Sequence, residues 1–369
     1  MTNTTSFASL ASEHISINSP ALEANPAPVI PLPDSAIATA SRHLGDVLHW
    51  CFQHPSAHAA VVVFDLRTDL SMALTQAYRH CLPDATFIDF DLNTPEQVLN
   101  SFKDLVAGDL VVLVQSTNFR MDAYRIRVEL FKRDLKVIEH PHLGRMPGEQ
   151  ALAYIDALAY DIDYYRGVGR GLKRLIDQAP NGMIDSGEGA QLVYASPFED
   201  AKLNIGDYSD MKNWGGQFPI GEVFTEAKDL LAVNGRVRIF VFGDTSFSVN
   251  KPPQPITLVI AQGQVVDVID STPAFDEVIA QIKADESVVW VRELGFGLNR
   301  TFNRERMVSD IGTYERMCGI HLSLGAKHGI YGKPNFKRGD GKYHVDVFAV
   351  TESVTLGEQV VFRDGAWVV

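Results

Sequence analysis

Residues 59–66, AAVVVFDL, form a continuous apolar run, and comparable runs recur at 85–92 (ATFIDFDL), 109–116 (DLVVLVQS) and 135–141 (LKVIEHP). Apolar residues with helical spacing lie before, between and after these runs, at residues 35–52, 69–80, 95–105, 125–134 and 147–177. Strands that are apolar throughout and alternate with helices are typical of a parallel sheet that is covered on both faces. The first half of the chain therefore predicts an α/β domain.

After Pro180 the pattern changes to short strands separated by Gly and Asp turns. Residues 256–269, ITLVIAQGQVVDVI, have the form of a strand, a turn at Gly263 and a second strand. One helix is expected at residues 275–284, and further strands follow it. We predict three parts: an extended arm rich in Ser, Thr, Ala, Asn and Pro (1–33), a parallel α/β domain (34–185), and a mostly antiparallel β-rich domain (186–369).

The composition excludes several functional classes. The 369 residues carry a formal net charge of −13 with a pI near 5.3, which disfavours binding to nucleic acid or to anionic membranes. No apolar run has the length of a membrane span, and the N-terminus does not resemble a secretory signal. The three cysteines are widely spaced and indicate reduced thiols rather than disulfides, so we expect a soluble, cytoplasmic protein.

Several cofactor or nucleophile motifs can be set aside on the sequence. The first strand runs into Arg67 without the glycines of a dinucleotide-binding turn. Three glycines at positions 167, 169 and 171 lie in a helical stretch, where close packing is the better interpretation. Cys318 near His321 is better explained as a small buried residue than as a nucleophile. His140 and His142 at a strand end are better explained as residues at the edge of the sheet than as metal ligands.

The second half also contains five residues of the types that bind metals. They are Glu222 in IGEVFT, Glu293 in VRELGFGLN, His321 in CGIHLSLG, and His344 and Asp346 in YHVDVF. Three carboxylates and two imidazoles are a suitable set for two divalent cations, and His344 and Asp346 would face the same side of a strand. Glu293 interrupts an apolar strand, where an unpaired charge is costly. The pattern alone leaves open a metal site or ordinary ion pairs, such as Glu293 with Arg292 or Arg300.

The sequence segments around these residues resemble those of the M29 family of metallo-aminopeptidases, of the aminopeptidase T and S type. The matching segments are GGQFPIGEVFTEAKDLLAVNGRVRIF, RELGFGLN, GIHLSLG and HVD, in the family's order, over about residues 186–369. The spacing is specific, because 28 residues separate Glu293 from His321 and 23 separate His321 from His344. The first half agrees with the family in fold class more than in sequence.

This resemblance implies an aminopeptidase that hydrolyses small peptides or amino-acid amides with water activated by two divalent metal ions. Its metals are zinc or cobalt, with manganese as a further candidate, and its ligands correspond to Glu222, Glu293, His321, His344 and Asp346. A homodimer is implied as well. Where the family has a tyrosine near the metals, this chain has His328, with Tyr331 three residues later, so either could donate a hydrogen bond to the oxyanion. The segment between His321 and His344 is basic, which suits acidic substrates or simply a solvated loop.

Two alternatives remain open. A mononuclear non-haem iron dioxygenase of the dihydroxypyridine type shares this scaffold and keeps the terminal HxD, but it needs histidine near the position of Glu293. A non-catalytic relative that serves as a binding protein is the other alternative. Glu222 and Glu293 favour the two-metal hydrolase over the dioxygenase, and the intact ligand set disfavours a non-catalytic relative.

Overall fold

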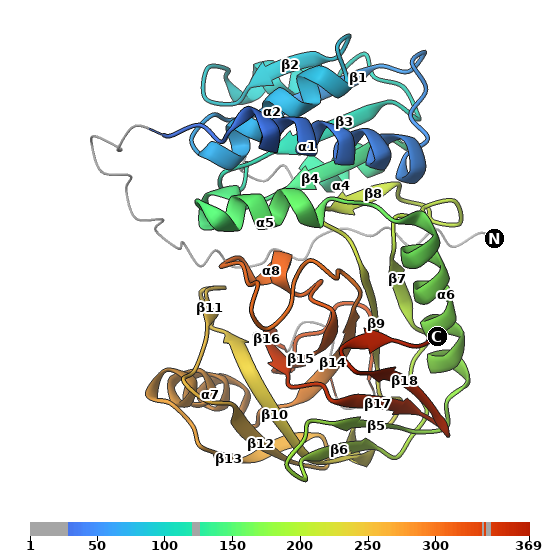
Figure 1. Cartoon of the computed structure of the whole chain (residues 1–369), viewed down its shortest axis with the longest axis vertical. Helices are drawn as coiled ribbons and strands as arrows, with labels where there is room; N and C mark the ends of the chain where they lie inside the picture. Colours follow the sequence, from blue (N-terminus) through green and yellow to red (C-terminus); the bar gives the residue numbers. More distant parts are fainter. Residues whose placement is uncertain (1–28, 120–125, 334–335, 337–340) are drawn as a thin grey trace, which may run out of the picture. The chain divides into compact units, whose positions relative to one another are not determined.

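The computed structural model describes residues 29–119, 126–333, 336 and 341–369 of the chain. Most of the arm predicted at residues 1–33 therefore lies outside the described residues. Residues Pro31–Val369 form one compact unit, which contains two β-sheets (Figure 1). No helix in the described part of the chain is long and apolar enough to cross a membrane.

The smaller sheet is parallel and has the strand order β2-β1-β3-β4-β8. Its strands are β1 (Ala60–Phe64), β2 (Thr86–Asp89), β3 (Leu110–Val114), β4 (Lys136–His140) and β8 (Gly215–Gln217). All residues of β1 and β3 are buried, as their continuous apolar runs predict. The last strand, β8, comes from far along the chain and pairs with β4.

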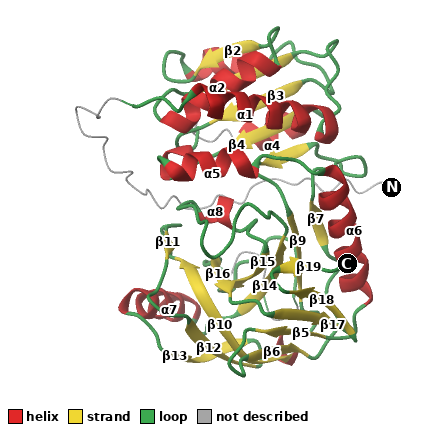
Figure 2. Ribbon diagram, viewed as in Figure 1, coloured by secondary structure: helices red, strands yellow, loops and turns green. Residues whose placement is uncertain are grey.

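Helices cover both faces of this sheet, because alternate strand residues enter two different cores. Val62 and Val112 pack with α1 (Asp34–Asp46), α2 (Asp69–Cys81) and α5 (Glu149–Ala157). Val63 and Val111 belong to a second core with α3 (Pro95–Ser101) and α4 (Ile126–Phe131). Helices α2 and α3 each begin at a threonine that forms a capping box. Figure 2 shows this arrangement of helices around strands.

The helical region predicted at residues 147–177 is interrupted. Helix α5 ends at Ala157, and the side chain of Asp161 accepts a hydrogen bond from the backbone N–H of Tyr164 at 3.0 Å. That contact is an N-cap, so a new helix, α6 (Ile162–Gln178), begins there. Short helical turns complete the set: η1 (Val47–Cys51), η2 (Leu143–Arg145), η3 (Leu230–Ala232) and α8 (Ile311–Tyr314).

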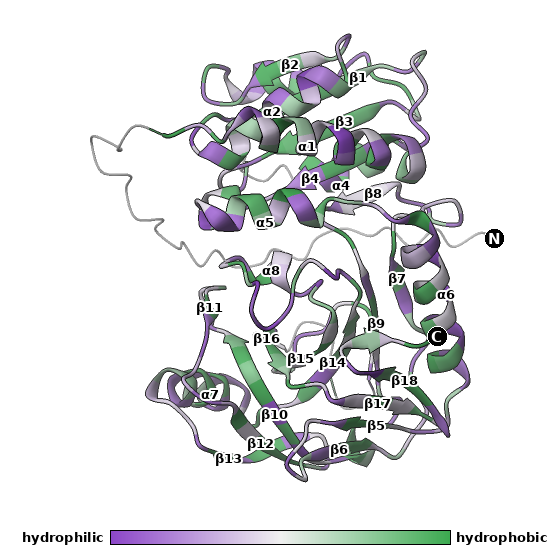
Figure 3. Ribbon diagram, in the orientation of Figure 1, coloured by the Kyte–Doolittle hydropathy of each residue, from purple (hydrophilic) through white to green (hydrophobic). Residues whose placement is uncertain are grey.

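The larger sheet has 14 strands in the described part of the chain, and its main path is β19-β18-β17-β5-β6-β10-β16-β15-β14-β9-β7. All of its pairings are antiparallel. Its strands are β5 (Gly182–Asp185), β6 (Gln191–Tyr194), β7 (Lys202–Asn204), β9 (Glu222–Glu226), β10 (Val233–Gly243), β11 (Val249–Asn250), β12 (Ile256–Ala261), β13 (Gln264–Ile269), β14 (Val291–Gly297), β15 (Gly319–Leu324), β16 (Val345–Ala349), β17 (Ser353–Leu356), β18 (Gln359–Arg363) and β19 (Ala366–Trp367). Figure 3 shows hydrophobic residues along the long central strand β10.

The structure confirms the predicted fold class, a parallel α/β region followed by a β-rich region. The expected turn at Gly263 joins β12 to β13, and the expected helix is α7 (Pro273–Glu286). Two strands lie on the other side of the predicted boundary from the rest of their sheet. Strand β5 precedes residue 186 but joins the larger sheet, and β8 follows it but joins the smaller sheet. The boundary near residue 185 stays a prediction.

Candidate metal centre

Four neighbouring strands of the larger sheet, β16-β15-β14-β9, carry the predicted ligands on one face. Paired residues of antiparallel strands point to the same side of a sheet. The pairs are Gly297 with Glu222, Gly295 with His321, and Ser323 with Asp346. Alternation within each strand adds Glu293, two residues before Gly295. The opposite face of these strands carries apolar core residues, among them Val223, Leu294, Phe296, Leu322 and Val347.

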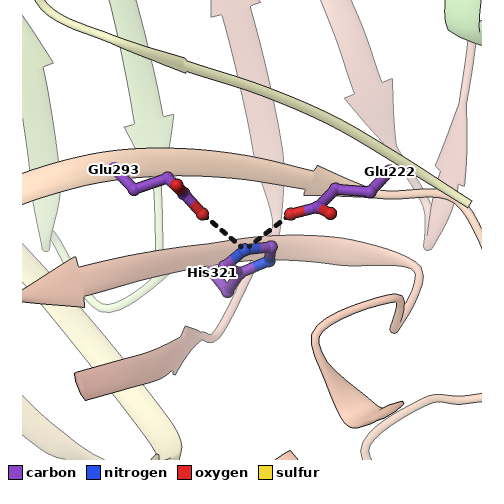
Figure 4. Close-up of side chains that lie close together, drawn as sticks. All are labelled: Glu222, Glu293 and His321. Atoms are coloured by element: carbon purple, nitrogen blue, oxygen red, sulfur yellow. Dashed lines mark ion pairs between the residues drawn. The ribbon is translucent and has the colours of Figure 1, made fainter. Parts of the chain in front are cut away.

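Glu222, Glu293 and His321 form a compact, buried group that could hold a metal ion (Figure 4). The Nε2 atom of His321 lies 3.2 Å from Oε1 of Glu222 and 3.6 Å from Oε1 of Glu293. The two carboxylates thus approach one imidazole nitrogen from two neighbouring elements, β9 and β14. Convergence of two carboxylate oxygens and an imidazole is typical of sites for zinc and similar divalent cations.

A glycine makes this convergence sterically feasible. The imidazole of His321 lies directly against the α-carbon of Gly295 on the next strand, where a β-carbon would lie 2.0 Å from Cε1 and 2.1 Å from Nε2 of the ring. No side chain other than hydrogen fits there without moving His321. The glycine of the ELGFG segment is therefore a structural requirement of the site.

The second group consists of His344 and Asp346, on and just before β16. His344 precedes the first residue of the strand, and its Nε2 atom lies 3.1 Å from Oδ1 of Asp346. Its other ring nitrogen, Nδ1, lies 3.1 Å from the carbonyl oxygen of Lys327. A carbonyl only accepts, so Nδ1 carries the proton of the neutral imidazole and Nε2 is left with a free lone pair. This is the arrangement that orients histidine ligands in metal sites.

His328 connects the two groups. Its Nε2 atom lies 3.1 Å from Oε2 of Glu293, its side chain is 2% exposed, and its ring is 6.2 Å from that of His344. The backbone N–H of Ile330 donates to its Nδ1 at 3.3 Å, so in the neutral imidazole the proton is on Nε2 and faces Glu293. The hydroxyl of Tyr331 instead donates to the carbonyl of Asp200 at 2.8 Å. Of the two predicted catalytic residues, His328 reaches the cluster, and the Tyr331 hydroxyl is bonded to backbone.

Electrostatics within the cluster favour positive charge. Burial lowers the pKa of His321, but the contacts with Glu222 and Glu293 outweigh this effect and raise the pKa to about 10. Burial also lowers the pKa of His344, but the nearby carboxylate of Asp346 outweighs this effect and the pKa is raised to about 9. Burial would raise the pKa of Glu293, yet the imidazoles of His321 and His328 hold it well below its usual range. The site thus stabilises cations at the atoms that would bind metal.

Several buried atoms of the cluster make no hydrogen bond to the described residues: both ring nitrogens of His321, Nε2 of His328 and Oδ1 of Asp346. Nε2 of His321 lies within ion-pair distance of Glu222 and Glu293, Nε2 of His328 lies within that distance of Glu293, and Oδ1 of Asp346 lies within that distance of His344. Buried polar atoms are normally satisfied. A buried imidazole nitrogen that faces two carboxylate oxygens without a hydrogen bond fits a metal ligand, so Glu222, Glu293 and His321 suit a metal ion.

The sequence interpretation missed Arg316, which is 5% exposed and lies behind Glu222. Its Nη1 atom is 3.1 Å from Oε2 of Glu222, so only Oε1 of that carboxylate faces His321. Ser323 was also missed, and its hydroxyl accepts a hydrogen bond from the backbone N–H of Glu293 at 2.9 Å. The alternation of β15 could have revealed Ser323, whereas nothing in the local sequence marks Arg316.

Other residues considered on the sequence lie elsewhere. His140 is buried between the hydroxyls of Tyr78 and Tyr154, and burial lowers its pKa to about 3. The three cysteines are free, and burial raises the pKa of Cys318 to about 11, which does not suit a nucleophile. The basic segment is only partly described, since residues 337–340 lie outside the described residues.

No family model matches the sequence, and no curated protein matches it. Several solved structures are similar, among them two that match at least 90% of this chain. One is 2,5-dihydroxypyridine dioxygenase from Pseudomonas putida KT2440, with a TM-score of 0.61 and 14% identity over 92% of this chain and 98% of that one. The other is wild-type AmpT from Thermus thermophilus, with a TM-score of 0.56 and 14% identity over 90% of this chain and 99% of that one. At this identity the similarity shows a common fold and no more.

Proposed function

We propose that the protein is a metal-dependent hydrolase that removes N-terminal residues from small peptides or amino-acid amides. The observation that carries the proposal is the buried Glu222–His321–Glu293 group, with its unsatisfied imidazole nitrogens. The resemblance of the surrounding sequence to M29 aminopeptidases supports it, as does the fold shared with AmpT, a member of that family.

Glu222, Glu293 and His321 would hold one divalent cation, and His344 and Asp346 would hold a second. Zinc or cobalt is proposed, with manganese as a further candidate. Bound cations of this kind lower the pKa of water and polarise a carbonyl group. Glu293 would hold the first cation, because its Oε1 faces His321, while its Oε2 faces His328.

The chain's own residues would supply the remaining chemistry. His328 presents a buried N–H at Nε2, which can donate a hydrogen bond to the oxygen that becomes negative when water adds to the carbonyl. Oε2 of Glu293 lies 3.1 Å from that Nε2, so Glu293 is placed to receive a proton and pass it to the departing amine. Tyr331 is proposed to support the loop through its bond to Asp200 rather than to touch substrate.

A mononuclear iron dioxygenase is the second candidate, and the fold similarity to 2,5-dihydroxypyridine dioxygenase supports it equally. His344 and Asp346 would supply one imidazole and the carboxylate, and the second imidazole would have to come from His321 or His328. His321 lies against Glu222 and Glu293. The N–H of Ile330 at Nδ1 leaves the proton of neutral His328 on Nε2, the nitrogen that faces Glu293. The chain has a carboxylate, Glu293, where the dioxygenase needs a histidine, and this favours the hydrolase.

Metal analysis of the purified protein tests the proposal. About two zinc, cobalt or manganese ions per chain, with hydrolysis of a broad panel of aminoacyl-amide reporters, would support the hydrolase. About one iron per chain with ring cleavage of dihydroxypyridines would support the second candidate. Glu293→Gln and His344→Ala should each abolish metal-dependent hydrolysis while leaving the fold intact. A reconstituted protein that cleaves no reporter would refute the aminopeptidase proposal.

Two further proposals concern assembly and location. We propose a homodimer, which the resemblance implies, because an aminopeptidase needs an enclosed site that admits only a free N-terminus. We also propose a cytoplasmic location, because the three widely spaced cysteines are typical of reduced thiols. Sedimentation of the purified protein would test the first, and cell fractionation the second.

A further inference from the structure

A buried ion-pair network lies beside the metal centre and uses none of its ligands. Arg292, next to Glu293 in β14, has a side-chain exposure of 2%, and its Nε contacts Oε1 of Glu226, which has a side-chain exposure of 0%. Lys333 is 2.6 Å from Oε1 of Glu199 and 3.4 Å from Oε2 of Glu226. Two cations face two carboxylates, so the network is neutral in itself. It therefore does not balance the charge of the ligand cluster.

Burying such a network brings little stability. The loss of solvation of buried charges can exceed the attraction between them, and well-packed apolar residues often serve as well. What the network does provide is geometry. Arg292 donates from Nη1 to the carbonyl of Ala326 at 2.6 Å and from Nη2 to the carbonyl of Tyr331 at 3.2 Å. Its guanidinium also lies 4.5 Å from the ring centre of Phe336.

These two carbonyls lie on either side of His328 in the chain. Ala326 precedes it by two residues, and Tyr331 follows it by three. A rigid guanidinium that holds both of them fixes the backbone turn between. Within that turn the N–H of Ile330 reaches Nδ1 of His328. By fixing this turn, the guanidinium of Arg292 keeps the N–H of Ile330 at Nδ1 of His328. The proton of the neutral imidazole is then on Nε2, which faces Glu293.

We infer that Arg292 is a positioning residue, which holds the loop 326–331 so that His328 presents its Nε2–H to Glu293. The inference rests on the proposed function for its catalytic consequence. The structural part, the tautomer of His328 and the order of the loop, is independent of any catalysis.

The first measurement is made on the metal-free protein. In protein labelled with 15N-histidine, assigned through His328→Phe, His328 should show a proton on Nε2 and none on Nδ1. In Arg292→Lys, which keeps the charge but lacks the planar fork that spans Glu226 and both carbonyls, that single signature should be lost, and peptides covering residues 326–331 should exchange amide hydrogen faster. Arg306→Lys, at the exposed pair with Asp156, is the matched control and should change neither. A wild-type His328 protonated on Nδ1 would overturn the inference even if Arg292→Lys failed to fold.

The second measurement is a double-mutant cycle on hydrolysis. Removing one oxyanion donor typically costs about 100-fold in kcat, and we expect that loss for His328→Phe. Arg292→Lys should lower kcat with little change in KM or bound metal, and should lower it by less than about twofold when added to His328→Phe. Equal effects in both backgrounds would overturn the inference. A protein without hydrolytic activity would contradict the proposed function, and the 15N and exchange measurements would still decide the role of Arg292.

Discussion

Gly295→Ala is the sharpest test of the metal centre, because it adds one methyl group at a place where the structure has no room. The new β-carbon would lie 2.0 Å from Cε1 and 2.1 Å from Nε2 of His321. Ordinary contact begins near 3.4 Å, so the ring must move by more than about 1 Å. His321 is fully buried between two strands, so it cannot retreat without disturbing its contacts with Glu222 and Glu293.

The expected effect has two parts. Overpacking of a filled interior typically costs about 1–3 kcal/mol of the free energy of unfolding. Displacing the imidazole should also weaken metal binding by roughly 10–100-fold, the loss typical when the groups that orient a ligand are removed. The binding part can be separated from the packing part by thermal unfolding with and without zinc. Saturating metal at 100 times Kd stabilises a native state by about 2.7 kcal/mol, and the variant should gain less than that at the same concentration.

Gly45→Ala is the matched control for this substitution. Gly45 lies in α1, has nothing within 4 Å of its added β-carbon, and should gain about 0.4–1 kcal/mol from a less flexible unfolded chain. Its metal affinity, measured by competition with a chelator, should equal that of the wild type. If Gly295→Ala also binds zinc with wild-type affinity, His321 is not a ligand in the observed pose and the proposed centre is wrong.

Three further predictions concern His140, His328 and Tyr331. Burial lowers the pKa of His140 to about 3, against 6.5 when unfolded, so its contribution to stability is complete above pH 6.5 and is lost as the pH falls. Relative to His140→Gln, the free energy of unfolding should drop by about 1.4 kcal/mol per pH unit between pH 6.5 and 3, and parallel curves of this free energy against pH for the two proteins would contradict the prediction. His328→Phe should reduce kcat about 100-fold while elemental analysis finds the metal content unchanged, and loss of metal would instead make His328 a ligand. Tyr331→Phe should lower the free energy of unfolding by about 0.5–1.5 kcal/mol in denaturant titrations, through the lost bond to Asp200, with kcat nearly unchanged; a large fall in kcat would restore Tyr331 as the donor.

Much of the fold could be predicted from the sequence, because the signals there are local. The apolar runs at residues 59–66 and 109–116 contain fully buried strands, and the helical spacing at 69–80 and 95–105 corresponds to α2 and α3. The break at Asp161 was missed, because residues 147–177 keep helical spacing on both sides of it. Strand β8 could not be predicted, since three residues of glycine and glutamine carry no strand signal of their own.

The candidate site follows the same division. The residue types and the resemblance to M29 aminopeptidases predicted Glu222, Glu293, His321, His344 and Asp346 as ligands. The sheet register brings all of them except His344, which lies just before β16, to one face. The contacts that the ligands make with residues from distant segments could not be predicted from the sequence. Arg316 reaches Glu222 from a segment 94 positions later, and the orientation of His328 depends on a backbone N–H.

The choice between the two enzyme classes depends on Glu293 rather than on the fold, because the dioxygenase and AmpT both share the fold at the same 14% identity. A site for one iron needs two imidazoles and one carboxylate around a single point, with a histidine near the position of Glu293. Glu293 instead turns a carboxylate oxygen to His321, and its other oxygen faces His328. A buried carboxylate is costly unless it is paired or binds a cation, and the proposed hydrolase gives Glu293 a cation to bind. Glu293 therefore agrees better with the proposed two-metal hydrolase than with a one-iron triad.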